Sequence, residues 1–203
     1  MDIYLVRHGL SIGNGRQRFM GWADHPLSSA GIRQAEALAS RFARLGPLPV
    51  YCSDLARARA TAELIAARWA GEVIVDRRWR ETHCGDLEDR PWAALNEDDG
   101  FSQRLDADPL GEPFPGGESL AMMMARVHAA FAELRELSLE RVLVVSHLGP
   151  LHAVLAHCLQ IPAARYWVLT MAHGSVTHLR QDQDWITIHS VSDTSHLAED
   201  IDA

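Results

Sequence analysis

The sequence of 203 residues contains no lysine, so its 19 Lys and Arg positions are all arginines. It has no basic run, and 27 acidic residues give it a formal net charge of −8. Because nucleic-acid binding depends on neutralising phosphates with basic side chains, this composition disfavours a nucleic-acid partner. The overall lack of lysine has no mechanistic explanation from the sequence.

Long apolar runs and cysteine motifs are also missing. No apolar run reaches the roughly 18 residues that a membrane span needs, and the first residues lack the basic and apolar regions of a signal peptide. Cys52, Cys84 and Cys158 are odd in number and far apart, which disfavours a disulfide framework or a thiolate metal site. We therefore expect a cytoplasmic protein that does not enter a membrane and needs neither a disulfide nor a metal to fold.

Strand-like apolar runs alternate with helical periodicities along the chain. The predicted strands are residues 2–6, 49–52, 72–76, 141–146 and, with a break at Gly174, parts of 166–192. The predicted helices are about 28–45, 55–70, 118–137 and 147–159. Residues 9–26 and 77–117 are irregular, and short helices are expected in the second of these segments. This order predicts one α/β domain over 1–203, a three-layer sandwich whose mostly parallel central sheet is flanked by helices.

Charged side chains follow four of the predicted strands, at the end where open α/β sheets bind their ligands. Arg7 and His8 follow the first strand, and Arg57 comes soon after the second. Glu81 comes after the third strand and His147 after the fourth. Their joint occurrence at successive strand ends predicts one site that holds two imidazoles, two guanidinium groups and a carboxyl group.

These side-chain types suit phosphoryl transfer. Arginine can donate two hydrogen bonds to two phosphate oxygens, and a neutral imidazole can attack phosphorus. A carboxylic acid can protonate the leaving alkoxide. A second, protonated imidazole can donate to the phosphoryl oxygens, so we expect neither a metal ion nor another cofactor.

Several segments, in sequence order, resemble the motifs of the histidine phosphatase superfamily, the phosphoglycerate mutase-like proteins. The matching segments are Leu5–Gly9 with Asn14, Gly21–Ala35, Ser53–Ala62, Glu81–Glu88, Pro115–Ser119 and Ser146–His147. The resemblance implies that His8 is the nucleophile and becomes a phosphohistidine. It also implies that Arg7, Arg57 and His147 bind the phosphoryl group.

The same resemblance implies two more donors and a proton donor. Asn14 and the backbone N–H of Leu148 would donate to the phosphoryl group. Glu81 would protonate the leaving group and later activate the water that releases phosphate. Glu88 is the alternative proton donor, and Arg80 beside Glu81 could instead hold Glu81 as an ionised carboxylate.

Some positions depart from the family's usual pattern or have two interpretations. Leu10 replaces an acidic residue, Asp89 replaces a glycine and Leu148 replaces a frequent Gly or Gln, and these changes could alter the substrate choice. Glu118 is expected in the first turn of its helix, where the helix dipole favours an acid. Ser119 is either a helix cap or a pocket residue.

We expect a metal-independent phosphomonoesterase whose partner is a small phosphorylated metabolite. The layout resembles the small bacterial phosphatases that include α-ribazole phosphatase, and sugar phosphatases of the family look similar. A phosphoglycerate mutase is the alternative enzyme, disfavoured by the short chain and the lack of lysine. A catalytically idle binding module of the same fold is the third alternative. The oligomeric state stays open, with a homodimer as one option.

Overall fold

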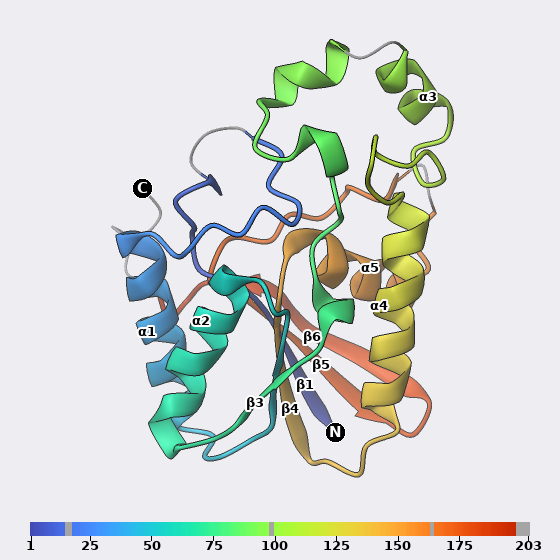
Figure 1. The fold of residues 1–203 in the computed structure, drawn as a ribbon. Helices are drawn as coiled ribbons and strands as arrows, with labels where there is room; N and C mark the ends of the chain where they lie inside the picture. The colour runs from blue at the N-terminus through green and yellow to red at the C-terminus, as the bar shows by residue number, and fades with distance from the viewer. Residues whose placement is uncertain (15–17, 98–99, 163–164, 198–203) are drawn as a thin grey trace.

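The computed structural model describes residues 1–14, 18–97, 100–162 and 165–197 (Figure 1). Within these ranges, the strands form one sheet in the order β3-β2-β4-β1-β5-β6. The strands are β1 Asp2–Arg7, β2 Val50–Cys52, β3 Val73–Val75, β4 Arg141–Ser146, β5 Val176–Asp182 and β6 Trp185–Asp193. β1, β2, β3 and β4 are mutually parallel, whereas β5 runs antiparallel to both of its neighbours. The expected α/β class with a mostly parallel sheet is confirmed.

Helices cover both faces of the sheet, which gives the predicted three layers (Figure 1). The α-helices are α1 Ser29–Ala43, α2 Ala56–Ala66, α3 Phe101–Ala107, α4 Leu120–Arg135 and α5 Leu148–Leu159. α1 and α2 pack on one face, and α4 and α5 pack on the other. None of the described helices is long and apolar enough to cross a membrane.

The central strands have apolar side chains on both faces. In β4, Val142 and Val144 belong to the core beneath α4 and α5, whereas Leu143 and Val145 belong to the core beneath α1 and α2. All four are fully buried. A strand covered on both faces reads as a continuous apolar run, as residues 142–145 do in the sequence.

Strand register brings the predicted site together. Arg7 pairs with Ser146 where the parallel strands β1 and β4 end, so the histidines that follow each strand are neighbours. Because β5 is antiparallel to β1, with Val6 opposite Val176, the segment before β5 also reaches this edge. Within the irregular segment 77–117, Trp79 packs into the core on one face of the sheet, whereas α3 lies beyond the same edge of the sheet as the site (Figure 1).

Two expectations about element ends were wrong. Residues 166–175 do not form a strand, because β5 begins only at Val176. Ser53 and Asp54 precede the helix predicted at about 55–70 and are residue types that can cap it, but neither caps α2. Its first N–H, from Ala56, instead donates to Asp24 Oδ1 at 2.6 Å, a contact across 32 positions that no local pattern signals.

Candidate active site

His8 follows β1 and is almost fully buried, with 3% of its surface exposed. Its Nδ1 lies 2.7 Å from the carbonyl oxygen of Gly9, and its Nε2 accepts from Arg57 Nε at 3.3 Å. This pattern requires the proton on Nδ1 and leaves the lone pair on Nε2. Burial, and after it the charges of His147 and Arg57, hold the pKa of His8 well below its ordinary value. The ring is therefore neutral near pH 7, as a nucleophile must be.

Arg57 lies in the first turn of α2 and is buried beside His8. Its Nη1 and Nη2 donate to the carbonyl oxygens of Ala23 and Gly21, both at 2.8 Å. Burial lowers the pKa of Arg57, and the negative charge of Glu81 opposes that effect. The loop before α1 therefore fixes the guanidinium plane next to His8 Nε2 without neutralising its charge.

Arg7, the last residue of β1, is also held by neutral groups. Its Nη1 donates to the carbonyl oxygen of Met171, and its Nη2 lies 2.8 Å from His173 Nε2. Burial lowers the pKa of Arg7 to about 10 and that of His173 to about 3. Near neutral pH a charged arginine therefore donates to a neutral imidazole. The buried Nε of Arg7 has no hydrogen-bond partner among the described residues.

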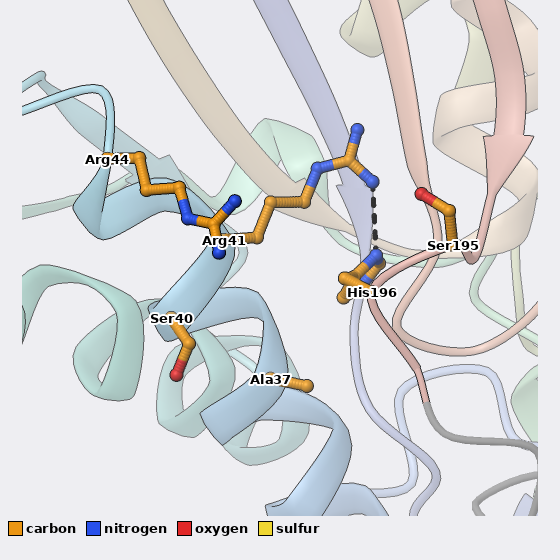
Figure 2. A pocket seen from close by; sticks show the side chains of 6 residues that line it. All are labelled: Ala37, Ser40, Arg41, Arg44, Ser195 and His196. Atoms are coloured by element: carbon orange, nitrogen blue, oxygen red, sulfur yellow. Dashed lines mark hydrogen bonds between the residues drawn. The ribbon is translucent and has the colours of Figure 1, made fainter.

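The segment that carries His173 is supported from behind by the end of the described chain. The Gly174 N–H donates to the carbonyl oxygens of Arg7 and His8 at 3.0 and 3.2 Å. His196 Nε2 lies 2.9 Å from the Gly174 carbonyl oxygen, and its Nδ1 lies 3.1 Å from Arg41 Nη1 of α1 (Figure 2). The residues drawn in Figure 2 line a separate cavity between α1 with its C-cap Arg44 and the pair Ser195 and His196, and none of them is a catalytic candidate. These contacts hold His173 against β1.

His147 follows β4 and is completely buried. Its ring centroid lies 4.9 Å from that of His8, with the ring planes at 61°. Neither ring nitrogen has a hydrogen-bond partner in the described part of the chain. Burial, followed by the charges of Arg57 and Arg7, lowers the pKa of His147 well below its ordinary value. Since buried polar atoms nearly always have partners, this ring is suited to donate to a bound anion.

Glu81 is placed against the start of α5. Its Oε2 accepts from the Gly149 N–H at 3.3 Å, and its Oε1 accepts from the Thr82 N–H at 2.9 Å. A Cβ on Gly149 would lie only 2.3 Å from Glu81 Oε1, so the close approach requires a glycine there. The carboxyl group and the positive end of the α5 dipole therefore face the same site.

The backbone of Glu81 is held by two side chains from distant segments. The Trp22 Nε1–H donates to the Glu81 carbonyl oxygen at 2.7 Å, and Arg126 Nη2 donates to the same oxygen at 2.8 Å. The Trp22 ring lies between the guanidinium of Arg80, 4.4 Å away, and the stacked ring of His83, 4.2 Å away. Trp22 thus links the loop that holds Arg57 to the segment that carries Glu81.

The structure tests two alternatives to Glu81 as the proton donor: an ion pair between Arg80 and Glu81, and Glu88 as the donor. Arg80 donates to both oxygens of Asp54 at 2.6 Å, so it does not hold Glu81 as a carboxylate. Glu88 accepts from the Trp22 N–H at 2.8 Å and is absent from the residues that line the cavity beside Arg7. Glu81 does line that cavity, so geometry favours it as the proton donor.

The expected place of Glu118 was wrong. Helix α4 begins at Leu120 with Ser119 as its N-cap, so Glu118 precedes the helix instead of occupying its first turn. Its carboxylate pairs with Arg126 and accepts from the His83 N–H at 2.9 Å. Glu118 therefore anchors the segment around Glu81 to α4, and Ser119 is a cap, not a pocket residue.

A cavity of about 340 Å³ lies beside Arg7 and Glu81. Among its lining residues are Arg7, Asn14, Glu81, Leu148 and Gly149. The Asn14 carbonyl oxygen accepts from the Ser11 N–H and hydroxyl at 3.0 and 2.6 Å, which leaves the amide N–H groups as its donors. No group of three or more His, Cys, Asp and Glu side chains that could hold a metal ion occurs in the described ranges.

Residues 3–194 match the model of the histidine phosphatase superfamily, branch 1. The chain belongs to this superfamily. It is 34% identical over 204 residues to a probable phosphoglycerate mutase, GpmB, of Yersinia pestis. The aligned region covers 97% of this chain and 95% of the relative. The alpha-ribazole phosphatase from Shigella flexneri has a TM-score of 0.86 at 27% identity, over 95% of this chain and 96% of that one. A mycobacterial glucosyl-3-phosphoglycerate phosphatase has a TM-score of 0.83 at 31% identity, over 95% of this chain and 99% of that one.

The departures from the superfamily pattern have local explanations. Asp89 stands where the superfamily usually has a glycine. Its φ is +61°, a conformation that glycine adopts without strain. It lies 2.6 Å from His25 Nε2. Leu10 is absent from the cavity lining, and its backbone bonds to Gln34 and Ser28 instead. Leu148 does line the cavity, so of these three positions it is the one placed to contact a substrate.

All the site residues predicted from the sequence gather at one edge of the sheet, and the catalytic roles assigned to them stay predictions. The residues are Arg7, His8, Asn14, Arg57, Glu81, His147 and Leu148. The sequence did not indicate that Met171 and His173 hold Arg7. Their segment was expected to be a strand, and the one local signal is the histidine itself beside Gly174.

Proposed function

We propose that this protein is a metal-independent phosphomonoesterase that forms a phosphohistidine at His8. The observation that carries the proposal is a buried set of nitrogens: the neutral His8 Nε2, the two unpartnered nitrogens of His147 and the unpartnered Nε of Arg7. A phosphoryl dianion offers acceptors to these donors and a phosphorus atom to His8. Its negative charge also favours the protonated form of His147, which opposes the effect of burial.

In the first step, His8 Nε2 attacks phosphorus and the bond from phosphorus to the leaving oxygen breaks. The Glu81 carboxylic acid gives its proton to that oxygen, so the product leaves as an alcohol. Arg7, Arg57 and His147 donate to the three equatorial oxygens, where the charge is spread. The Nδ1–H of His8 donates to the Gly9 carbonyl throughout, which stabilises the positive charge that develops on the ring.

In the second step, water attacks the phosphohistidine. The Glu81 carboxylate, formed in the first step, takes a proton from this water, and the bond between phosphorus and His8 Nε2 breaks. Phosphate leaves, and the neutral ring and the carboxylic acid are restored. A neutral nucleophile and a protonated acid predict a bell-shaped pH profile, with its optimum mildly acidic or near neutral.

A mutase is the second candidate, because the Yersinia pestis relative carries that description. It would return the phosphoryl group from His8 to a second hydroxyl instead of to water. For the phosphatase, an α-ribazole phosphate or a sugar phosphate is the candidate substrate, since the two phosphatase relatives carry names of these kinds. A cytoplasmic location and a homodimer stay predictions, as does the absence of nucleic-acid and membrane partners.

The test is hydrolysis of p-nitrophenyl phosphate in excess EDTA, from about pH 5 to 8, with vanadate as inhibitor. His8→Ala should abolish turnover and the acid-labile phosphoprotein that rapid quenching traps. His157→Ala is the matched control, since this exposed residue of α5 lies outside the site. Full activity in His8→Ala would disprove the mechanism. Transfer between phosphoglycerates, with free phosphate as a minor product, would identify a mutase, and no turnover with either substrate would favour the idle module.

A further inference from the structure

The cavity beside Arg7 and Glu81 has aromatic and aliphatic walls. They come from four separate parts of the chain: the loop before α1, the segment 77–117, the start of α4 and the chain around α5. Six of the apolar side chains in these walls are Phe19, Trp92, Phe114, Leu120, Leu148 and Trp167. A volume of about 340 Å³ is at the small end of the range for small-molecule sites.

The two tryptophans are unusually accessible. Trp92 is 58% and Trp167 is 55% exposed, although large aromatic side chains are mostly buried in folded proteins. Both line the same concave surface, where exposed apolar area usually marks a binding site. Apolar contact with a ligand would remove this area from water.

The Trp167 wall is already held in place. Its ring stacks on the fully buried His152 of α5, with 5.4 Å between centroids and 15° between planes, and lies edge-on to Tyr166 at 4.8 Å. The Tyr166 hydroxyl donates to the Gly149 carbonyl at 3.1 Å. The turn of α5 that positions Glu81 therefore also supports the ring of Trp167.

A second wall, around Phe114, is held by an aromatic cluster. Phe114 lies 6.1 Å from Phe19 and 5.6 Å from Phe101, ring centroid to ring centroid. Phe101, in α3, is fully buried and packs with Leu87. Both walls are thus supported by buried side chains, so little ordering is needed when a ligand enters.

Few charged groups of the described residues line the cavity. They are Arg7, Glu81 and Arg18. In the proposed reaction, Arg7 binds the phosphoryl group and Glu81 moves the proton. Arg18 Nη1 already donates to the Asp89 carbonyl oxygen at the rim. A leaving group with its own carboxylate or second phosphate would meet mostly apolar surface, with Arg18 as the one described lining cation that the phosphoryl group does not use.

On the basis of the proposed phosphatase function, we propose that the substrate's leaving group is a flat, apolar, uncharged body, such as an aromatic ring system, that lies between Trp167 and the wall of Trp92 and Phe114. The phosphate end then reaches Arg7, and the leaving oxygen lies near Glu81. Binding of this body places the phosphorus at His8, so its loss lowers kcat/KM.

The test compares kcat/KM for three monoesters of primary alcohols of similar acidity: 2-phenylethyl phosphate, glycerol 3-phosphate and 3-phosphoglycerate. We expect 2-phenylethyl phosphate to be preferred by about tenfold or more over the other two. Trp167→Ala and Trp92→Ala should each lower that preference several-fold and leave glycerol 3-phosphate nearly unaffected. Trp167→Phe should retain part of the preference. Trp185→Ala, at a 74% exposed position of β6, is the tryptophan control.

The outcomes separate this proposal from the function on which it rests. If no monoester is hydrolysed and no phosphohistidine forms, the phosphatase function is wrong. If the three esters are hydrolysed equally well, or 3-phosphoglycerate is preferred, the phosphatase stands and the apolar leaving-group site is refuted. Equal losses for all three esters in Trp167→Ala would likewise refute it, since the wall would then have only a structural role.

Discussion

Gly149→Ala tests whether the contact between α5 and Glu81 sets the proton donor. The added methyl group would meet Glu81 Oε1 at 2.3 Å, so the oxygen must retreat by at least about 0.7 Å to reach the 3.0 Å below which real contacts almost never occur. Misplacement of a catalytic group by about 1 Å can cost about 10²-fold in rate. General acid catalysis as a whole supplies about 10²–10⁴-fold. We therefore expect kcat for an alkyl phosphate to fall by about 10²-fold.

How far kcat falls with each leaving group identifies which group in the site Gly149→Ala displaces. A nitrophenolate leaves readily without a proton, so kcat for p-nitrophenyl phosphate should fall by less than about fivefold in Gly149→Ala. Glu81→Gln should show the same pattern, and Gly149→Ala should cost little more in the Glu81→Gln background. Stability should not explain the loss, because alanine in place of a helical glycine favours the helix by up to about 1 kcal/mol.

The control is Gly46→Ala, at a position with open space and a φ of +75°. This change should lower the melting temperature through backbone strain and leave kcat unchanged for both substrates. Equal losses of kcat for alkyl and p-nitrophenyl phosphates in Gly149→Ala would refute the argument, because they would place the damage at the phosphoryl group instead of at the leaving oxygen.

Three further predictions concern the groups around the phosphoryl site. Arg57→Lys should lower kcat/KM by about 10²-fold or more in steady-state assays, because the single nitrogen of an ammonium lacks the planar fork whose three nitrogens reach two loop carbonyls and His8. His173 binds no proton in the folded state until about pH 3, whereas the unfolded chain binds one below about 6.5, so stability is lost as pH falls through this window. When the pH is lowered from 7.5 to 5.5, the free energy of unfolding in urea should therefore fall by about 1.4 kcal/mol less in His173→Gln than in the parent protein. An equal fall in both proteins would contradict a lowered pKa for His173. Glu118→Gln leaves the partly buried Arg126, whose side chain is 19% exposed, without a counter-charge and should lower the free energy of unfolding by about 2 kcal/mol, whereas no change in the urea midpoint would show that the pair is not needed.

The sequence predicted those site residues whose positions follow from the parallel arrangement of the strands. Arg7, His8 and His147 come directly after two apolar runs, and open α/β sheets gather such residues at one edge. This prediction needed no knowledge of the loops, because the register of β1 against β4 places Arg7 beside Ser146. The same rule pointed to Arg57 and Glu81 after the second and third strands, and the family resemblance assigned their roles and added Asn14 and Leu148.

Long-range partners could not be predicted in the same way. The partner of Arg7 at position 173 is 166 residues away and depends on the antiparallel placement of β5. The cap of α2 comes from Asp24, and the fork of Arg80 goes to Asp54 instead of its neighbour Glu81. Such contacts depend on which loops meet in three dimensions, and local propensity carries no information about that.

The surroundings of the arginines reconcile an acidic protein with an anionic substrate. Elsewhere in the described chain, arginines such as Arg41, Arg78 and Arg126 pair with carboxylates within 2.8 Å, so much of their charge is neutralised. Arg7 and Arg57 form no ion pair with any described residue and are held by backbone carbonyls and imidazoles instead. Neutral acceptors orient a guanidinium and leave its charge uncompensated in a buried place, where it acts strongly on a dianion. The net charge of −8 therefore does not oppose phosphate binding at this site.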